Sequence, residues 1–112
     1  MPSRIFLAAF LAATCLTLAP VFAAGTTSVD IKLFQYKPRE LDVKKGDTVT
    51  WMNGDAIEHS VTSGKPGKPA NAFDSGFFTQ GGSFSHTFGE AGSFTYFCKR
   101  HPNMQATVKV AP

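Results

Sequence analysis

Apolar and polar residues alternate with a period of two through most of the chain beyond residue 24. The alternating runs lie at 29–33, 41–43, 49–51, 84–88, 94–98 and 106–110. This pattern is typical of strands with one buried face, and Gly, Pro, Asp or Asn residues separate the runs as turn signals. No apolar stripe of helical period extends beyond a turn or two. The pattern therefore predicts an all-β fold.

The regular spacing of these runs predicts a two-sheet Greek-key β-sandwich of seven to eight strands. We also expect strand structure at 73–78 and in the run His59-Ser60-Val61-Thr62, in which the period of two places His59 on the same face as Val61. The Gly/Pro-rich segment 64–72 lies between these two stretches. We expect it to be a solvated loop.

Residues 1–23 have the pattern of a secretory signal peptide. Arg4 precedes an apolar run from Ile5 to Leu18, and Pro20 and the exit Val21-Phe22-Ala23 follow. The run has roughly 14 residues, short of the ~20 that span a bilayer as a helix. We therefore expect cleavage after Ala23, or after Ala24, and an exported protein without a membrane anchor. The remaining residues, 24–112, are expected to form a single domain.

Removal of this leader takes Cys15 with it and leaves Cys98 as the sole thiol. A lone thiol in an oxidising compartment requires burial, pairing with another chain, or a metal. The absence of a second cysteine excludes a CxxC redox motif, haem attachment through CxxCH and a zinc ribbon. The formal net charge of +3, which falls to +2 without Arg4, is too small to indicate nucleic-acid binding.

Cys98, His101 and Met104 follow one another at three-residue intervals at the end of the run 94–98. The period of two directs the Cys98 sulfur inward, and His59 is the best-placed fourth donor. Two imidazoles, a thiolate and a weaker thioether are the donor set of blue-copper electron-transfer sites. Zinc sites rarely contain methionine. The residues therefore predict one copper ion that alternates between Cu(I) and Cu(II).

Two further polar residues near this set have separate interpretations. His86 alternates with Phe84 and Phe88, so we expect a core or rim residue rather than a ligand. Ser60 follows His59 directly, and its side chain is expected to form a hydrogen bond near the thiolate that helps to set the reduction potential.

The donor set favours a diffusible electron carrier. A copper enzyme needs an open coordination position or additional histidines, and only His86 remains after His59 and His101. The alternative function is a periplasmic copper-binding or copper-handling protein with no electron-shuttle role. Such a protein favours exposed Met- or His-rich tracts, and this sequence has none.

Three groups of residues resemble the cupredoxin family. They are Trp51-Met52-Asn53 with His59-Ser60-Val61, Phe73-Asp74-Ser75-Gly76, and the run 92–104. The two-residue gaps on either side of His101 resemble the amicyanin branch. The resemblance implies a periplasmic, monomeric copper-binding β-sandwich that shuttles single electrons, with His59, Cys98, His101 and Met104 as ligands. It suggests a quinoprotein dehydrogenase as electron donor and a c-type cytochrome as acceptor.

The sequence departs from this pattern around the expected ligands. Glu58 stands where amicyanins often have Pro, Lys99-Arg100 stand where they often have Thr-Pro, and Asn103 replaces a bulky apolar residue. We expect Lys99 and Arg100 to make the rim around an exposed His101 basic, which favours an acidic or mixed-charge partner. The alternative is a solvated pair with no role, because single rim charges mainly tune association rates.

Overall fold

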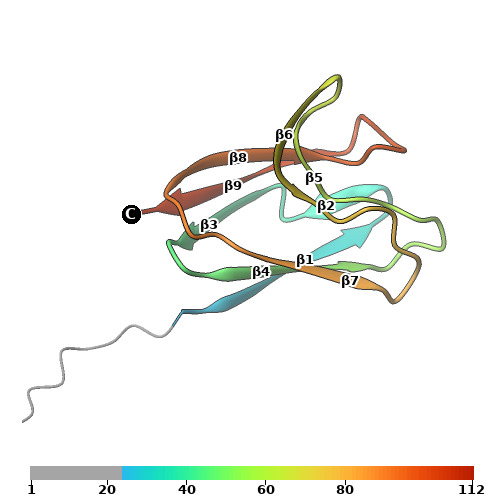
Figure 1. Cartoon of the computed structure of the whole chain (residues 1–112). Coiled ribbons are helices and arrows are strands. Elements are labelled where there is room, and N and C mark those ends of the chain that lie inside the picture. Colours follow the sequence, from blue (N-terminus) through green and yellow to red (C-terminus); the bar gives the residue numbers. More distant parts are fainter. Residues whose placement is uncertain (1–23) are drawn as a thin grey trace, which may run out of the picture.

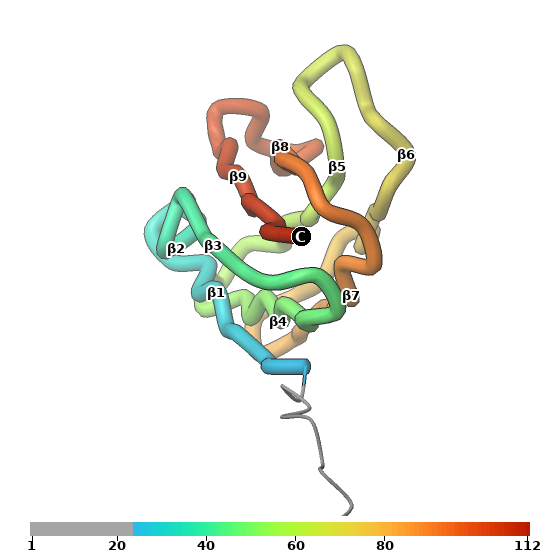
Figure 2. The backbone as a smooth tube through the Cα atoms, turned by 90° about the vertical axis from the view of Figure 1, so that its left-hand side faces the viewer, coloured from blue at the N-terminus to red at the C-terminus, as the bar shows by residue number. Residues whose placement is uncertain are grey.

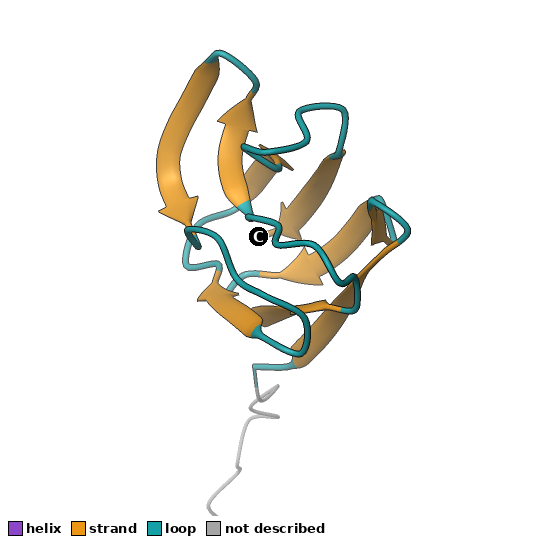
Figure 3. Cartoon of the chain, turned by 90° about the vertical axis from the view of Figure 1, so that its right-hand side faces the viewer, coloured by secondary structure: helices purple, strands orange, loops and turns teal. Residues whose placement is uncertain are grey.

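The computed structural model describes residues 24–112, and the expected signal peptide lies outside them. Figure 3 shows that the described chain consists of strands and loops. The strands are β1 (Thr26–Lys32), β2 (Gln35–Lys37), β3 (Glu40–Lys44), β4 (Thr48–Asn53), β5 (Thr62–Lys65), β6 (Lys68–Asp74), β7 (Ser83–Thr87), β8 (Gly92–Phe97) and β9 (Gln105–Ala111). Within the described residues, no helix has the length and hydropathy to cross a membrane.

The strands form two sheets that face each other (Figure 1). One sheet has the order β2-β1-β4-β7, and the other has the order β3-β9-β8-β5-β6. β1 pairs in parallel with β4 and β3 in parallel with β9, whereas the other neighbours are antiparallel. The chain thus passes several times from one sheet to the other. The predicted all-β Greek-key sandwich is confirmed.

The described residues contain nine strands, more than the seven to eight predicted, because short or exposed strands lack a clear alternating pattern. β2 has only three residues, and β6 exposes every residue except Phe73. The segment 64–72, which we expected to be a loop, belongs to the β5–β6 hairpin that stands out from the sandwich in Figure 2. The strand expected at 73–78 ends at Asp74, and His59 forms only an isolated bridge with Phe78.

The core lies between the sheets and is built from the alternating residues. Trp51 is fully buried, and the aromatic rings around it come from both sheets. Their centroids lie 5.4–6.5 Å from that of Trp51; these are the rings of Phe73, Phe84, Phe88 and Tyr96. Burial of each large side chain contributes about 1.5–3 kcal/mol. This packing fixes the position of the end of β8, and Cys98 directly follows that strand.

Three connections between strands meet at one end of the sandwich. Figure 1 shows the β1–β2 turn, the β4–β5 connection and the β8–β9 connection at this end, opposite the start of β1 and the C-terminus. Leu33 lies in the first of these connections. The alternation predicted that Leu33 continues the buried face, but the chain turns there with φ values of 54° at Leu33 and 59° at Phe34, and Leu33 is 67% exposed.

Candidate metal centre

Two of these connections, β4–β5 and β8–β9, bring one cysteine sulfur and two imidazoles together. Cys98 Sγ lies 3.8 Å from His59 Nδ1 and 3.9 Å from His101 Nδ1. All three donor atoms lie within 4.8 Å of one another. Cys98 and His59 are fully buried, whereas His101 is partly exposed. The cluster therefore lies just beneath the surface, with one imidazole reaching solvent.

These separations fit a single metal ion. Nitrogen and sulfur donors about 2.0–2.3 Å from one ion in a trigonal plane lie about 3.5–3.8 Å apart. The observed sulfur–nitrogen distances, 3.8 and 3.9 Å, lie at and just above the upper end of this range. A trigonal His₂Cys set is the arrangement in which a weak axial thioether completes a blue-copper centre. The donor chemistry of the described residues thus fits copper.

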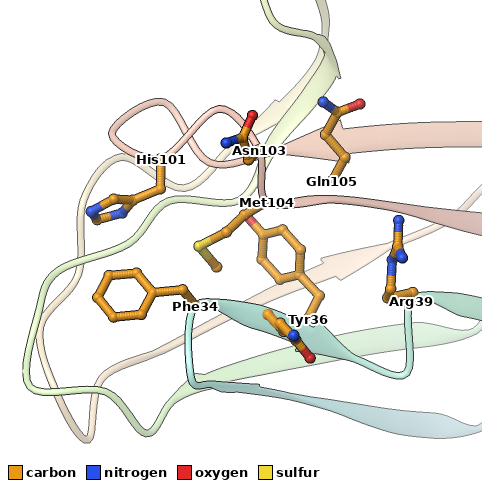
Figure 4. A pocket seen from close by; sticks show the side chains of 8 residues that line it. Phe34, Tyr36, Arg39, His101, Asn103, Met104 and Gln105 are labelled. Carbon is orange, nitrogen blue, oxygen red and sulfur yellow. The ribbon is translucent and has the colours of Figure 1, made fainter.

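The connection from β8 to β9 is a tight turn that carries His101 and Met104. The Met104 amide donates to the His101 carbonyl oxygen at 2.9 Å, and the Cys98 amide donates to the Met104 carbonyl oxygen at 3.1 Å. Pro102 lacks an amide proton and so cannot extend the β8 ladder into this turn. Figure 4 shows the Met104 thioether between the side chains of His101 and Phe34. Met104 is 4% exposed, and a groove of about 440 Å³ runs beside it.

Ser60 holds the sulfur through its main chain. Its amide donates to Cys98 Sγ at 3.4 Å, while its hydroxyl accepts a 2.9 Å hydrogen bond from the Lys99 amide. The Ser60 carbonyl accepts a hydrogen bond from the Tyr36 hydroxyl at 2.5 Å, and burial raises the pKa of Tyr36, so this donor stays protonated. We expected the Ser60 side chain to lie near the thiolate. Its hydroxyl does form a hydrogen bond beside Cys98, with the Lys99 amide, whereas the group that contacts the sulfur itself is the backbone amide.

Asp55 holds the ring of His59 from the other side. Its carboxylate accepts a hydrogen bond from His59 Nε2 at 2.9 Å, and the Asp55 amide donates to Asn53 Oδ1 at 2.9 Å. Burial acts to raise the pKa of Asp55, but hydrogen bonds from the Phe34 amide, His59 and the Leu33 amide outweigh it and hold this pKa below its ordinary value. Sequence reasoning missed Asp55, although its position four residues before His59 was the available signal.

Lys99 and Arg100 are both paired. Arg100 Nη1 lies 2.6 Å from Glu58 Oε1, and Lys99 Nζ bonds to Asp74 Oδ2. These pairs tie the segment between Cys98 and His101 to the β4–β5 connection, through Glu58, and to the end of β6, through Asp74. The expected basic rim is therefore largely neutralised, because each cation has its own carboxylate.

Phe34 is an aromatic contact of both histidines that the sequence did not reveal. Its ring centroid lies 5.4 Å from that of His59 and 4.9 Å from that of His101, edge to face in both cases. Partial burial lowers the pKa of His101, and its interactions with His59 and Arg100 act in the same direction, which favours the neutral ring. His86 packs between two phenylalanine rings, away from the cluster, as expected for a rim residue.

Comparison with known proteins agrees with this geometry. Residues 23–111 match the family model described as copper binding proteins, plastocyanin/azurin family. The chain is 37% identical over 95 residues to amicyanin of Paracoccus versutus, covering 81% of this chain and 72% of that protein. It is 40% identical over 90 residues to amicyanin of Paracoccus denitrificans, and the match covers 79% of this chain and 67% of that protein. The solved structure of a purple cupredoxin from Nitrosopumilus maritimus superposes with a TM-score of 0.70 at 31% identity. The superposition covers 76% of this chain and 99% of that one.

Proposed function

Because the chain belongs to the plastocyanin/azurin family of copper-binding proteins, which are electron carriers and not enzymes, we propose that it shuttles single electrons between redox proteins. The proposed ligands of its one copper ion are His59, Cys98, His101 and Met104. The observation that carries this proposal is the set of three donor atoms within 4.8 Å of one another, of which only His101 reaches solvent.

Copper supplies a one-electron couple at this position, and the protein supplies a fixed donor geometry. Ser60 and Asp55 hold the Cys98 sulfur and the His59 ring by hydrogen bonds from opposite sides. The main-chain bonds of the β8–β9 turn hold Met104. Donors fixed in this way need little rearrangement when the charge of the site changes, which favours rapid outer-sphere transfer.

An apolar surface around His101 favours docking of a protein partner. Leu33, Phe34, Ile57 and Phe77 are 41–67% exposed. Phe34 contacts both histidines. Leu33 is next to Phe34 in the chain, and Ile57 is two residues before His59. Phe77 directly precedes Phe78, which forms a β-bridge with His59. Exposed apolar residues gathered in one place are typical of interaction sites. With Lys99 and Arg100 paired, apolar contact rather than charge selects the partner.

The relatives support a more specific context. The amicyanin-like gaps in the ligand run support a quinoprotein dehydrogenase as donor and a c-type cytochrome as acceptor. The signal-peptide pattern of residues 1–23 supports export to the periplasm. The similarity to amicyanins supports a monomeric domain formed by residues 24–112.

Reconstitution with copper tests this function. The chain from residue 24 is loaded with Cu(II), and its visible and electron spin resonance spectra are recorded beside those of Cys98→Ser. We expect an intense visible band, a reversible one-electron voltammogram, and loss of the band in the variant. A colourless wild-type protein would overturn the proposal. A coloured protein that passes its copper readily to an acceptor but exchanges electrons poorly would favour copper handling instead.

A further inference from the structure

Asp55 is a nearly buried acid, 9% exposed, at which three hydrogen bonds converge. Its Oδ1 accepts from the Leu33 amide at 2.8 Å. Its Oδ2 accepts from the Phe34 amide and from His59 Nε2, both at 2.9 Å. Three donors aimed at one carboxyl group favour its charged form. An anion therefore lies directly behind one proposed copper ligand.

We propose that Asp55 is a positioning residue that lowers the reduction potential of the site and joins His59 to the Leu33–Phe34 turn. This inference rests on the proposed copper site and extends it to a residue outside the ligand set. A neutral imidazole carries one proton. The bond from Nε2 to Asp55 fixes that proton on Nε2 and leaves Nδ1, which faces Cys98, free to bind metal.

The charge of Asp55 favours the more positive state of the metal. Hydrogen bonding of a ligating imidazole to a carboxylate raises the basicity of the ligand. Because His59 is fully buried, water does not substitute for this partner or screen it. The added electron density stabilises Cu(II) more than Cu(I), which lowers the reduction potential.

The same carboxylate holds a strained turn. Leu33 and Phe34 both adopt left-handed conformations, which are unfavourable for residues other than glycine. The Leu33 and Phe34 amides both donate to the charged Asp55 carboxylate, and such hydrogen bonds are strong enough to offset this strain. The turn places the Phe34 ring against His59 and His101. One acid thus positions both a ligand and an aromatic ring of the docking surface.

The central test is the reduction potential of copper-loaded Asp55→Asn. We expect its preference for Cu(II) to weaken about tenfold, which for a one-electron couple raises the potential by about 59 mV. Asp55→Glu keeps the charge and should retain most of the low potential. Asp30→Asn removes the same charge from an exposed position on β1 and should shift the potential far less.

A second measurement does not depend on the variant folding. Nitrogen-15 NMR of the wild-type Cu(I) protein should show His59 protonated at Nε2, with a downfield proton that exchanges slowly with water. A rapidly exchanging proton at this nitrogen would overturn the proposal, as would an Asp55→Asn potential equal to that of Asp30→Asn. If either result is found while the wild-type protein shows the intense visible band, only the role of Asp55 is refuted and the copper site is retained. Absence of that band would instead overturn the proposed function.

Discussion

Glu58 and Arg100 form an ion pair, with 2.6 Å between Oε1 and Nη1, and each residue directly precedes one of the two histidines of the candidate site. The pair joins the β4–β5 connection to the β8–β9 connection beside the partly exposed His101. Both side chains remain about half exposed, so the pair contributes about 0.2–1 kcal/mol to stability. Its larger effect is to cancel the charge of Arg100 where a partner would dock.

Removal of this carboxylate should make electron exchange sensitive to salt. In Glu58→Gln, Arg100 has no partner, so we expect the rate of oxidation by hexacyanoferrate(III), an anion, to rise about twofold at low ionic strength. The gain should disappear as salt screens the charge. Stopped-flow kinetics over a range of ionic strength measure this effect.

The matched control is Glu40→Gln, which removes the same charge from β3, outside the three connections. Apart from the small effect of the changed net charge, its oxidation rates should depend on ionic strength as those of the wild type do. If both variants show the same salt dependence, the Glu58–Arg100 pair does not govern the charge of the docking surface.

Ser60→Ala should destabilise the ligand segment. The hydroxyl accepts a hydrogen bond from the Lys99 amide, and its loss leaves a partly buried donor without this partner, at a cost of about 1–3 kcal/mol. Urea denaturation gives the free energy of unfolding. The comparison variant is Ser85→Ala, whose hydroxyl bonds to Thr50 on an exposed face, where water replaces the lost partner. Equal losses in the two variants would contradict the structural role of Ser60.

Gly64→Ala should disrupt the β5–β6 hairpin. Gly64 has a φ of 105°, and an added Cβ would lie 2.5 Å from the backbone nitrogen of Ala70 and from the carbonyl oxygen of Lys68. Conformational strain and overpacking together predict a loss of about 2–5 kcal/mol. Gly67→Ala is the control, because its φ is 78° but a Cβ there would meet nothing within 4 Å. It should cost only the strain, about 1–2 kcal/mol. Urea midpoints that coincide would refute the close backbone approach at Gly64.

The carboxylate of Asp47 should give stability that depends on pH. Hydrogen bonds from the amides of Lys44 and Gly25 hold the pKa of Asp47 below its usual value. A group with a lowered folded-state pKa stabilises fully above its unfolded value, about 3.9, and loses this contribution as the pH falls through the folded-state value. Asp47→Asn should therefore be less stable than the wild type at pH 7, with the difference shrinking toward pH 3.

Thermal unfolding at matched copper loading measures this difference across the pH range. Asp42→Asn removes an equal charge from an exposed position on β3 and provides the baseline. A gap between Asp47→Asn and the wild type that stays constant down to pH 3 would show that the turn does not depend on the ionised carboxylate.

Much of the sandwich was predictable because its strands bury one face. In β1, β4 and β9 the buried residues alternate with more exposed ones, so the period of two in the sequence is the period of burial. The prediction failed where this condition does not hold. From His59 to Thr62 every residue is buried, and in β6 nearly every residue is exposed, so neither segment has an informative alternation.

The clustering of His59, Cys98 and His101 was predictable from the sequence, whereas the surroundings of these candidate donors were less so. Three of the predicted donor residues fall within seven consecutive residues, so their proximity follows from the chain itself. Glu58 and Asp74 lie 42 and 25 residues from the cations that they neutralise. No local pattern reports such distant pairings. The basic rim was therefore expected from the charges of Lys99 and Arg100 alone, because only the tertiary structure brings their carboxylate partners close to them.

The C-terminus lies far from the connections that carry the candidate ligands, and this has a practical consequence. The C-terminus and the start of β1 lie at the same end of the sandwich, opposite the β8–β9 connection that carries His101 (Figure 1). A tag, tether or fused protein attached at residue 112 would point away from the docking surface. The molecule is thus suited to oriented immobilisation on an electrode through its C-terminus, with the exposed imidazole facing the solution.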